Sequence, residues 1–299
     1  MNDAATPGTI ATGKPKLRTA AGGYAMLALD QRESLRAMFG QRADGSWVDD
    51  DELRRFKRQA TEVLAPHASA VLLDRPYAID GHRPDWVSDA YGLIVAADAL
   101  DQQTGGPVRN TTFDEQVTVE FLHRVRADAI KFLVIWRPGT GKEERADVVA
   151  RTVEVARDAG VASLVEAIVA TDDGSPWPSE AERHQAIFAA AEEIAPYRPD
   201  LYKAQVPGYV PGDLSRVADQ ARTITEIVGT DWVVLSNGIA REDFADAVRE
   251  SVRGGAKGFL AGRAVWADLV GSADTPSMLA QISIPRLQQL TGIVDAAQA

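Results

Sequence analysis

The chain has 299 residues, a formal net charge of −11, 45% hydrophobic residues and no cysteine. This length is enough for one large α/β domain or two ordinary ones, and the composition is that of a globular protein. The negative charge argues against a general nucleic-acid binder, which needs an excess of basic residues to follow phosphates. Without cysteine, disulfides and thiol catalysis are both excluded.

The N-terminal segment and the lengths of the apolar runs predict the domain organisation. Residues 1–18 begin with MNDAATPGTIATGKPK, which lacks an apolar signal core, so we expect a flexible tail there and one catalytic domain over 19–299. No apolar run reaches the ~20 residues that a membrane helix needs. We therefore expect a cytoplasmic protein that binds neither membranes nor nucleic acids.

Eight short apolar runs alternate with helical patterns along the chain. Eight strand–helix units are what a closed barrel requires, and no run is followed by the G-x-G-x-x-G turn of a doubly wound sheet. The pattern therefore predicts the α/β class and a single (β/α)₈ TIM barrel. The expected strands are 24–30, 69–74, 92–98, 129–136, 162–170, 200–206, 232–238 and 257–266. The clearest expected helices are 49–64, 142–160, 179–194 and 241–255.

The charged residues inside or at the ends of these apolar runs include Asp30, Lys131, Glu166 and Lys203. Active sites of such barrels form at the C-terminal ends of the strands. Strand alternation places Lys203 on the face opposite its apolar neighbours, which aims it into the barrel. A buried ammonium group is rare unless it has a partner or a task.

A buried lysine beside carboxylates suits Schiff-base chemistry. Burial and a neighbouring cation lower the pKa of a lysine, so that a neutral amine can attack a carbonyl. The protonated imine is then an electron sink for carbon–carbon cleavage, while Asp30, Glu166 and Lys131 are available to move protons. These residue types leave the choice between Lys131 and Lys203 open. The structural alternative is that Glu166 is only an ion-pair partner and that strand-end aspartates, among them Asp74 and Asp98, are caps or loop acceptors.

The ends of the first, seventh and eighth runs predict where a substrate anion binds. Loops after strands seven and eight of these barrels often hold phosphate through backbone N–H groups, and Arg263 would add a fixed charge. Arg32, across the rim, is the candidate for a second anion. The expected substrate-binding residues are Gln31, Arg32, Ser236, Asn237, Gly238, Gly262 and Arg263.

Metal-dependent and serine-hydrolase chemistry are both poorly supported. The chain has four histidines, and no two of them have the spacing of metal ligands. Ser236 lacks the G-x-S-x-G setting and an evident histidine partner. We therefore expect neither a metal nor another cofactor.

Nearly the whole chain, from about residue 22 to 295, carries a family resemblance. The stretches that carry it are GGYAMLALDQRESLRAMF, APHASAVLLD, LIVAAD, AIKFLVIWR, DLYKAQVP, WVVLSNG, GGAKGFLAGRAVW and LQQLTGIVD. The chain resembles the class I, Schiff-base aldolases of the tagatose-1,6-bisphosphate aldolase group, and within it the sulfofructosephosphate aldolases. The resemblance implies that Lys203 is the Schiff-base lysine and that Asp30, Lys131 and Glu166 are its catalytic neighbours. It also implies an anion held by Ser236, Gly238, Gly262 and Arg263.

The resemblance further implies a function. We expect a metal-independent aldolase of sulfoglycolysis that cleaves 6-deoxy-6-sulfofructose 1-phosphate to dihydroxyacetone phosphate and 3-sulfolactaldehyde, as a homo-oligomer (dimer or tetramer). The alternatives are a tagatose or fructose 1,6-bisphosphate aldolase and a non-catalytic sugar-phosphate-sensing barrel. Asn237 departs from the serine of the sulfosugar enzymes, so substrate identity is less well supported than cleavage chemistry.

Overall fold

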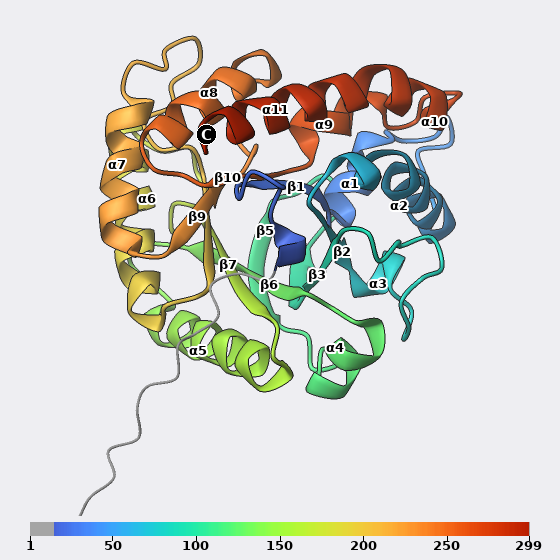
Figure 1. Cartoon of the computed structure of the whole chain (residues 1–299), viewed down its shortest axis with the longest axis horizontal. Coiled ribbons are helices and arrows are strands. Elements are labelled where there is room, and N and C mark those ends of the chain that lie inside the picture. The colour runs from blue at the N-terminus through green and yellow to red at the C-terminus, as the bar shows by residue number, and fades with distance from the viewer. Residues whose placement is uncertain (1–14, 299) are drawn as a thin grey trace, which may run out of the picture.

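The computed structural model describes residues 15–298, which form a closed barrel of eight parallel strands inside a ring of helices (Figure 1). The predicted single (β/α)₈ barrel is confirmed. Around the barrel the strand order is β1-β10-β9-β8-β7-β6-β3-β2. The barrel strands are β1 (Tyr24–Leu29), β2 (Ala70–Asp74), β3 (Gly92–Ala96), β6 (Ala129–Trp136), β7 (Ala162–Val169), β8 (Leu201–Ala204), β9 (Asp231–Val234) and β10 (Gly258–Ala261).

The helices that surround the barrel include all four that the sequence predicts, with ends shifted by at most two residues: α2, α5, α6 and α8. Their ends follow the expected chemistry, since Ser179 accepts a hydrogen bond from the Glu182 N–H and Gly160 ends α5 in a left-handed conformation. In residues 15–298 none of the helices is both long and apolar enough to cross a membrane. The α-helices are α1 (Glu33–Met38), α2 (Asp50–Leu64), α3 (Arg75–Ala78), α4 (Val119–Val125), α5 (Lys142–Ala159), α6 (Glu180–Ile194), α7 (Val217–Val228), α8 (Arg241–Arg253), α9 (Arg263–Trp266), α10 (Thr275–Met278) and α11 (Ile284–Ala296).

The structure contains one element that the sequence pattern did not predict, a β-hairpin. Directly after β3, strands β4 (Asp98–Gln102) and β5 (Val108–Phe113) pair antiparallel and form a hairpin outside the barrel. The hairpin is an insertion between β3 and α4, the helix that leads into β6. Its strands carry DALDQ and VRNTTF, which are polar and partly exposed, so they lack the continuous apolar run of a barrel strand.

The interior of the barrel is built in layers. Its lower layer is an apolar cluster that includes Met26, Ile94, Leu164, Leu201 and Leu260. Two residues further along each strand, the alternation brings the next side chain to the same inner face. On β7 and β8 this next layer is charged, and the strand register sets its glutamate beside its lysine. The charged layer therefore lies at the C-terminal end of the barrel, above an apolar floor.

The start of the barrel domain differs from the expectation. Residues 15–18 do not belong to a tail, because Leu17 is buried and its carbonyl accepts a hydrogen bond from Ser69 Oγ at 2.8 Å. Arg18 forms an ion pair with Asp231 and lies over the ring of Tyr24. The remaining part of the predicted tail, 1–14, lies outside the described residues.

A fully buried ion pair joins the helical ring to the barrel. Lys57 on α2 pairs with Asp74 at the end of β2, and both side chains are inaccessible to solvent. The Lys57 ammonium also donates to the carbonyl of Leu29 at 2.7 Å, at the end of β1. Asp74 in turn caps α3 by accepting from the Tyr77 N–H at 3.1 Å, as the cap interpretation of this residue predicts.

We expect Asp74→Ala to lower the free energy of unfolding by about 3–5 kcal/mol, because it leaves the Lys57 ammonium buried without a carboxylate. Urea unfolding followed by circular dichroism measures this loss. The double variant Lys57→Met/Asp74→Asn removes both charges and should recover part of it. A loss in Asp74→Ala well below about 1 kcal/mol would contradict the role of this pair.

Candidate active site

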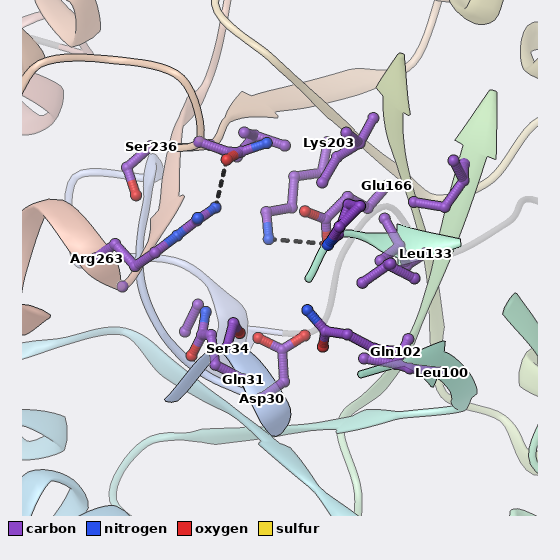
Figure 2. A pocket seen from close by; sticks show the side chains of 18 of the residues that line it. Asp30, Gln31, Ser34, Leu100, Gln102, Leu133, Glu166, Lys203, Ser236 and Arg263 are labelled. Atoms are coloured by element: carbon purple, nitrogen blue, oxygen red, sulfur yellow. Dashed lines mark hydrogen bonds and ion pairs between the residues drawn. The ribbon is translucent and has the colours of Figure 1, made fainter. Parts of the chain in front are cut away.

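A cavity of about 370 Å³ opens at the C-terminal ends of the barrel strands. Figure 2 shows Ser236 and Arg263 on one side of it and Leu100, Gln102 and Leu133 on the other. Its lining combines the charged layer of the barrel, the loops after β1, β9 and β10, and the β4–β5 hairpin. The lining residues that the sequence predicts are Asp30, Gln31, Lys131, Glu166, Lys203, Ser236, Asn237, Gly262 and Arg263.

Lys131 lies at the centre of the charged layer and is almost completely buried. Its Nζ is 2.8 Å from Asp30 Oδ2, 3.0 Å from Asp98 Oδ2 and 2.9 Å from Glu166 Oε2. Burial alone would lower the pKa of Lys131, but the three carboxylates outweigh it and hold this pKa well above its ordinary value. Lys131 donates hydrogen bonds to Asp30 and Asp98 and forms an ion pair with Glu166, so it is a fixed cation surrounded by three carboxylates.

Lys203 has a different environment on the neighbouring side of Glu166. Its Nζ lies 3.0 Å from Glu166 Oε2, and in residues 15–298 this is the one carboxylate within ion-pair distance. The side chain is 3% exposed and lines the cavity, as Figure 2 shows. Of the two lysines that the sequence left as candidates, Lys203 is the one whose amine keeps directions open toward the cavity.

The two carboxylates in the cavity wall are held as anions. Burial raises the pKa of Asp30 and of Glu166, but the charges of Lys131 and Lys203 outweigh it, so both pKa values lie below their usual range. Within residues 15–298, no group of three or more histidine, aspartate or glutamate side chains is arranged to hold a metal ion.

The opposite wall carries the expected anion-binding side chains. Arg263 begins α9, and its guanidinium donates to Asn237 Oδ1 at 2.6 Å. Gly262 lets the chain pass against β1, because a Cβ there would lie 2.3 Å from the carbonyl oxygen of Ala28. Ser236 and Asn237 line the cavity, while Gly238 is exposed and lies outside the lining.

Arg32 does not take the place that the sequence analysis gave it. Its guanidinium donates to Asp98 Oδ1 at 3.0 Å, and its Nε lies 3.9 Å from Asp74 Oδ2. It faces a second hollow under the hairpin and not the cavity that holds Lys203. The prediction that Arg32 binds a second substrate anion is corrected, because two buried carboxylates draw the guanidinium away.

Two contributions to the site were not predicted from the sequence. Asp98, which was interpreted as a cap or loop acceptor, is bound to Lys131. Leu100, Gln102 and Val108 of the hairpin cover one side of the cavity. The position of Asp98 in the sequence could have indicated this role, because Asp98 ends an apolar run in the same way as Asp30 does.

A layer of buried charges that includes two lysines lines the cavity at the mouth of the barrel. Residues 24–268 match the model of the DeoC/LacD family aldolase, so the chain belongs to this family of carbon–carbon lyases. The tagatose 1,6-diphosphate aldolase of Listeria monocytogenes is 25% identical over 279 residues, covering 86% of this chain and 81% of that protein. The tagatose 1,6-diphosphate aldolase 2 of Enterococcus faecalis is 25% identical over 283 residues, covering 86% of this chain and 84% of that protein.

Solved structures agree on the fold. An archaeal fructose 1,6-bisphosphate aldolase superposes with a TM-score of 0.62 at 18% identity, over 94% of this chain and 97% of that one. The fructose-bisphosphate aldolase of Plasmodium falciparum superposes with a TM-score of 0.68 at 13% identity, over 95% and 93% of the two chains. These identities support a shared barrel and nothing finer.

We expect acid to destabilise the protein partly through Asp30. Its folded pKa lies below the unfolded value of about 3.9, so its contribution is fully present well above pH 4 and is lost as the pH falls through the unfolded pKa toward the folded one. In Asp30→Asn, the free energy of unfolding should fall less steeply between pH 5 and 3, by up to about 1.4 kcal/mol per pH unit. Urea unfolding at several pH values measures the slope, and an unchanged slope would contradict the ion pair with Lys131.

Proposed function

We propose that the protein is a class I aldolase in which Lys203 forms a Schiff base with the ketone of a ketose 1-phosphate. The observation that carries the proposal is the unequal placement of the two buried lysines. Lys131 Nζ has three carboxylates within 3.0 Å and donates hydrogen bonds to two of them, whereas the Lys203 amine has one carboxylate within ion-pair distance in the described residues. This contrast supports Lys203 as the nucleophile and Lys131 as a permanent charge.

The reaction would begin at the substrate's C2 carbonyl. The Lys203 amine adds to C2, the resulting carbinolamine loses water, and a protonated imine forms. Glu166, which lies 3.0 Å from Lys203 Nζ, is placed to carry the protons of these steps. Because it also faces Lys131, it stays anionic between steps.

Cleavage then needs a base at the C4 hydroxyl. We assign this role to Asp30, which is ionised and lines the cavity. As the hydroxyl proton leaves, the C3–C4 electron pair moves toward the imine, the aldehyde departs, and an enamine remains on Lys203. Protonation at C3 and hydrolysis of the imine then release dihydroxyacetone phosphate and restore the amine.

The phosphate of this product fits the wall formed by Ser236, Asn237, Gly262 and Arg263. The cavity lining in the described part of the chain has three basic side chains, and Lys131 and Lys203 are committed to the charged layer. Arg263 is therefore the remaining fixed cation for an anion, and its planar fork can pair with two phosphate oxygens. This arrangement supports a substrate with one phosphate at that end.

The other end of the cavity favours a particular kind of aldehyde fragment. Its wall is aliphatic and carries no lysine or arginine among the lining residues in 15–298: Leu100, Val108, Leu133, Ile135 and Ile168. A phosphate dianion would lose its hydration there without a paired cation. A sulfonate carries a single charge and can be held by neutral donors such as the amide of Gln102. We therefore propose 6-deoxy-6-sulfofructose 1-phosphate as the substrate, cleaved to dihydroxyacetone phosphate and 3-sulfolactaldehyde.

Tagatose or fructose 1,6-bisphosphate is the second candidate substrate. The curated relatives at 25% identity are tagatose 1,6-diphosphate aldolases, which favours it. The absence of a lysine or arginine from the aliphatic end of the described cavity lining counts against it. A non-catalytic sensor is less well supported than either, because a sensor has no need of a reactive amine beside ionised carboxylates.

We expect borohydride, added in the presence of dihydroxyacetone phosphate, to reduce the imine and leave a covalent adduct on the peptide that contains Lys203. Peptide mass spectrometry locates the adduct. Lys203→Met should abolish it, and Lys257→Met, a control at a lysine outside the cavity, should keep it. An adduct on Lys131 in the unmodified protein would refute the assignment.

We expect kcat/KM for 6-deoxy-6-sulfofructose 1-phosphate to exceed that for tagatose and fructose 1,6-bisphosphate by roughly tenfold or more, since an unpaired buried charge costs about 1.5–3 kcal/mol. A coupled assay for dihydroxyacetone phosphate measures the three substrates in parallel. Arg263→Lys is the control for the shared end and should weaken all three by similar factors. Highest kcat/KM with either bisphosphate would overturn the sulfosugar assignment and leave the lysine chemistry intact.

A further inference from the structure

Asp98 lies behind the cavity and makes a larger set of contacts than a cap would. It is the first residue of β4 and is 2% exposed. Its Oδ2 accepts from Lys131 Nζ at 3.0 Å and from the Leu133 N–H at 3.1 Å, and its Oδ1 accepts from Arg32 at 3.0 Å. Because it does not line the cavity, it reaches the chemistry only through Lys131.

Asp98 is also part of a row of buried charges that alternate in sign. The row runs from Lys57 on α2 through Asp74, Arg32 and Asp98 to Lys131 at the barrel centre. The loosest link is the 3.9 Å between Arg32 and Asp74, and the link from Arg32 to Asp98 is a hydrogen bond. Arg32 therefore holds Asp98 by Oδ1, the oxygen that does not accept from Lys131, and the two contacts together fix the position of the carboxylate.

The third N–H of Lys131 depends on this carboxylate. The other two carboxylates near Lys131 Nζ, those of Asp30 at 2.8 Å and Glu166 at 2.9 Å, border the substrate cavity. If Asp98 lost its charge, Lys131 would keep one N–H without an ionised acceptor in a buried wall. Its ammonium form would be less favoured, and its direction would be less well defined.

We propose that Asp98, backed by Arg32, is a positioning residue that holds Lys131 as an ammonium aimed at Asp30 and Glu166. This inference rests on the proposed function, because it assigns those two carboxylates to proton transfer at the imine. It gives Arg32 the task of supporting the site from behind instead of binding a substrate anion.

Every charged group that faces Lys131 enters the expected pH dependence. Asp30 follows β1, Asp98 begins β4, Glu166 lies on β7, and Lys203 lies on β8. Arg32 stands behind Asp98. Neutralising Asp98 removes one of three nearby negative charges, so Lys131 should lose its proton at lower pH.

The test uses a partial reaction that is independent of the aldehyde. When dihydroxyacetone phosphate forms an imine, a C3 hydrogen is removed and replaced from solvent, so deuterium exchange in heavy water reports proton transfer directly. Asp98→Asn keeps the shape and an acceptor for the Leu133 N–H and removes only the charge. The apparent pKa of the alkaline limb of the exchange rate should fall by about one unit or more, and the maximal rate should fall about tenfold.

The matched control is Asp114→Asn. Asp114 is also a carboxylate beside the hairpin, but it pairs with Arg75 at 2.7 Å and has no contact with Lys131. Its pH profile should match the wild type. A merely structural role for Asp98 would lower the rate by the same factor at all pH values, and that result, or an unchanged profile, would overturn the proposal.

Two further measurements keep the test decisive. If Asp98→Asn does not fold, Arg32→Gln is the second variant, because it removes the guanidinium that holds Asp98. It should lower the exchange rate about tenfold while borohydride trapping at Lys203 persists. An unchanged rate would overturn the proposal. If the wild type neither exchanges nor traps, the proposed function fails together with this inference. If the wild type does both and Asp98→Asn behaves identically, only the role of Asp98 fails.

Discussion

The structure of the site depends on one buried ammonium group that three carboxylates surround. Lys131 brings Asp30, Asp98 and Glu166 to a single point at the top of the barrel. Three carboxylates around one ammonium leave two negative charges, and the nearest cations on either side are Lys203 and Arg32. The site is thus close to neutral before a substrate enters, as a buried group of charges must be. Arg263 is then the positive charge that we propose for the substrate phosphate.

The barrel makes this arrangement possible because its register places the charged layer on an apolar floor. Glu166 and Lys203 are direct neighbours in the β7–β8 register, and the residues two positions earlier on these strands are leucines. The Lys57–Asp74 pair ties α2 to the ends of β1 and β2, next to Asp30. The hairpin begins at Asp98 and covers one side of the cavity. The same element therefore borders the cavity and carries an ion-pair partner of Lys131.

The sequence predicts the barrel and the residues of its buried charged layer well, for a physical reason. Charged residues inside apolar runs are costly, so Asp30, Lys131, Glu166 and Lys203 stand out without any structure. Their strand alternation also predicts the face on which they lie. The contrast between the two lysines is different, because it depends on how many carboxylates reach each Nζ, and this is a property of three-dimensional packing.

Two further features depend on long-range contacts that the local pattern does not report. The hairpin was missed because its strands are polar and pair only with each other. Arg32 follows Asp30 along the chain, which suggests the cavity, but Asp98 lies 66 residues away and draws the guanidinium to the other side.

A crystal structure of the protein reduced with borohydride in the presence of dihydroxyacetone phosphate tests the central claim most directly. The account predicts continuous density from Lys203 Nζ to C2 of the trapped triose, with its phosphate on Arg263 and with Lys131 still bound to its three carboxylates. Density joined to Lys131, or a phosphate at the aliphatic end of the cavity, would contradict it.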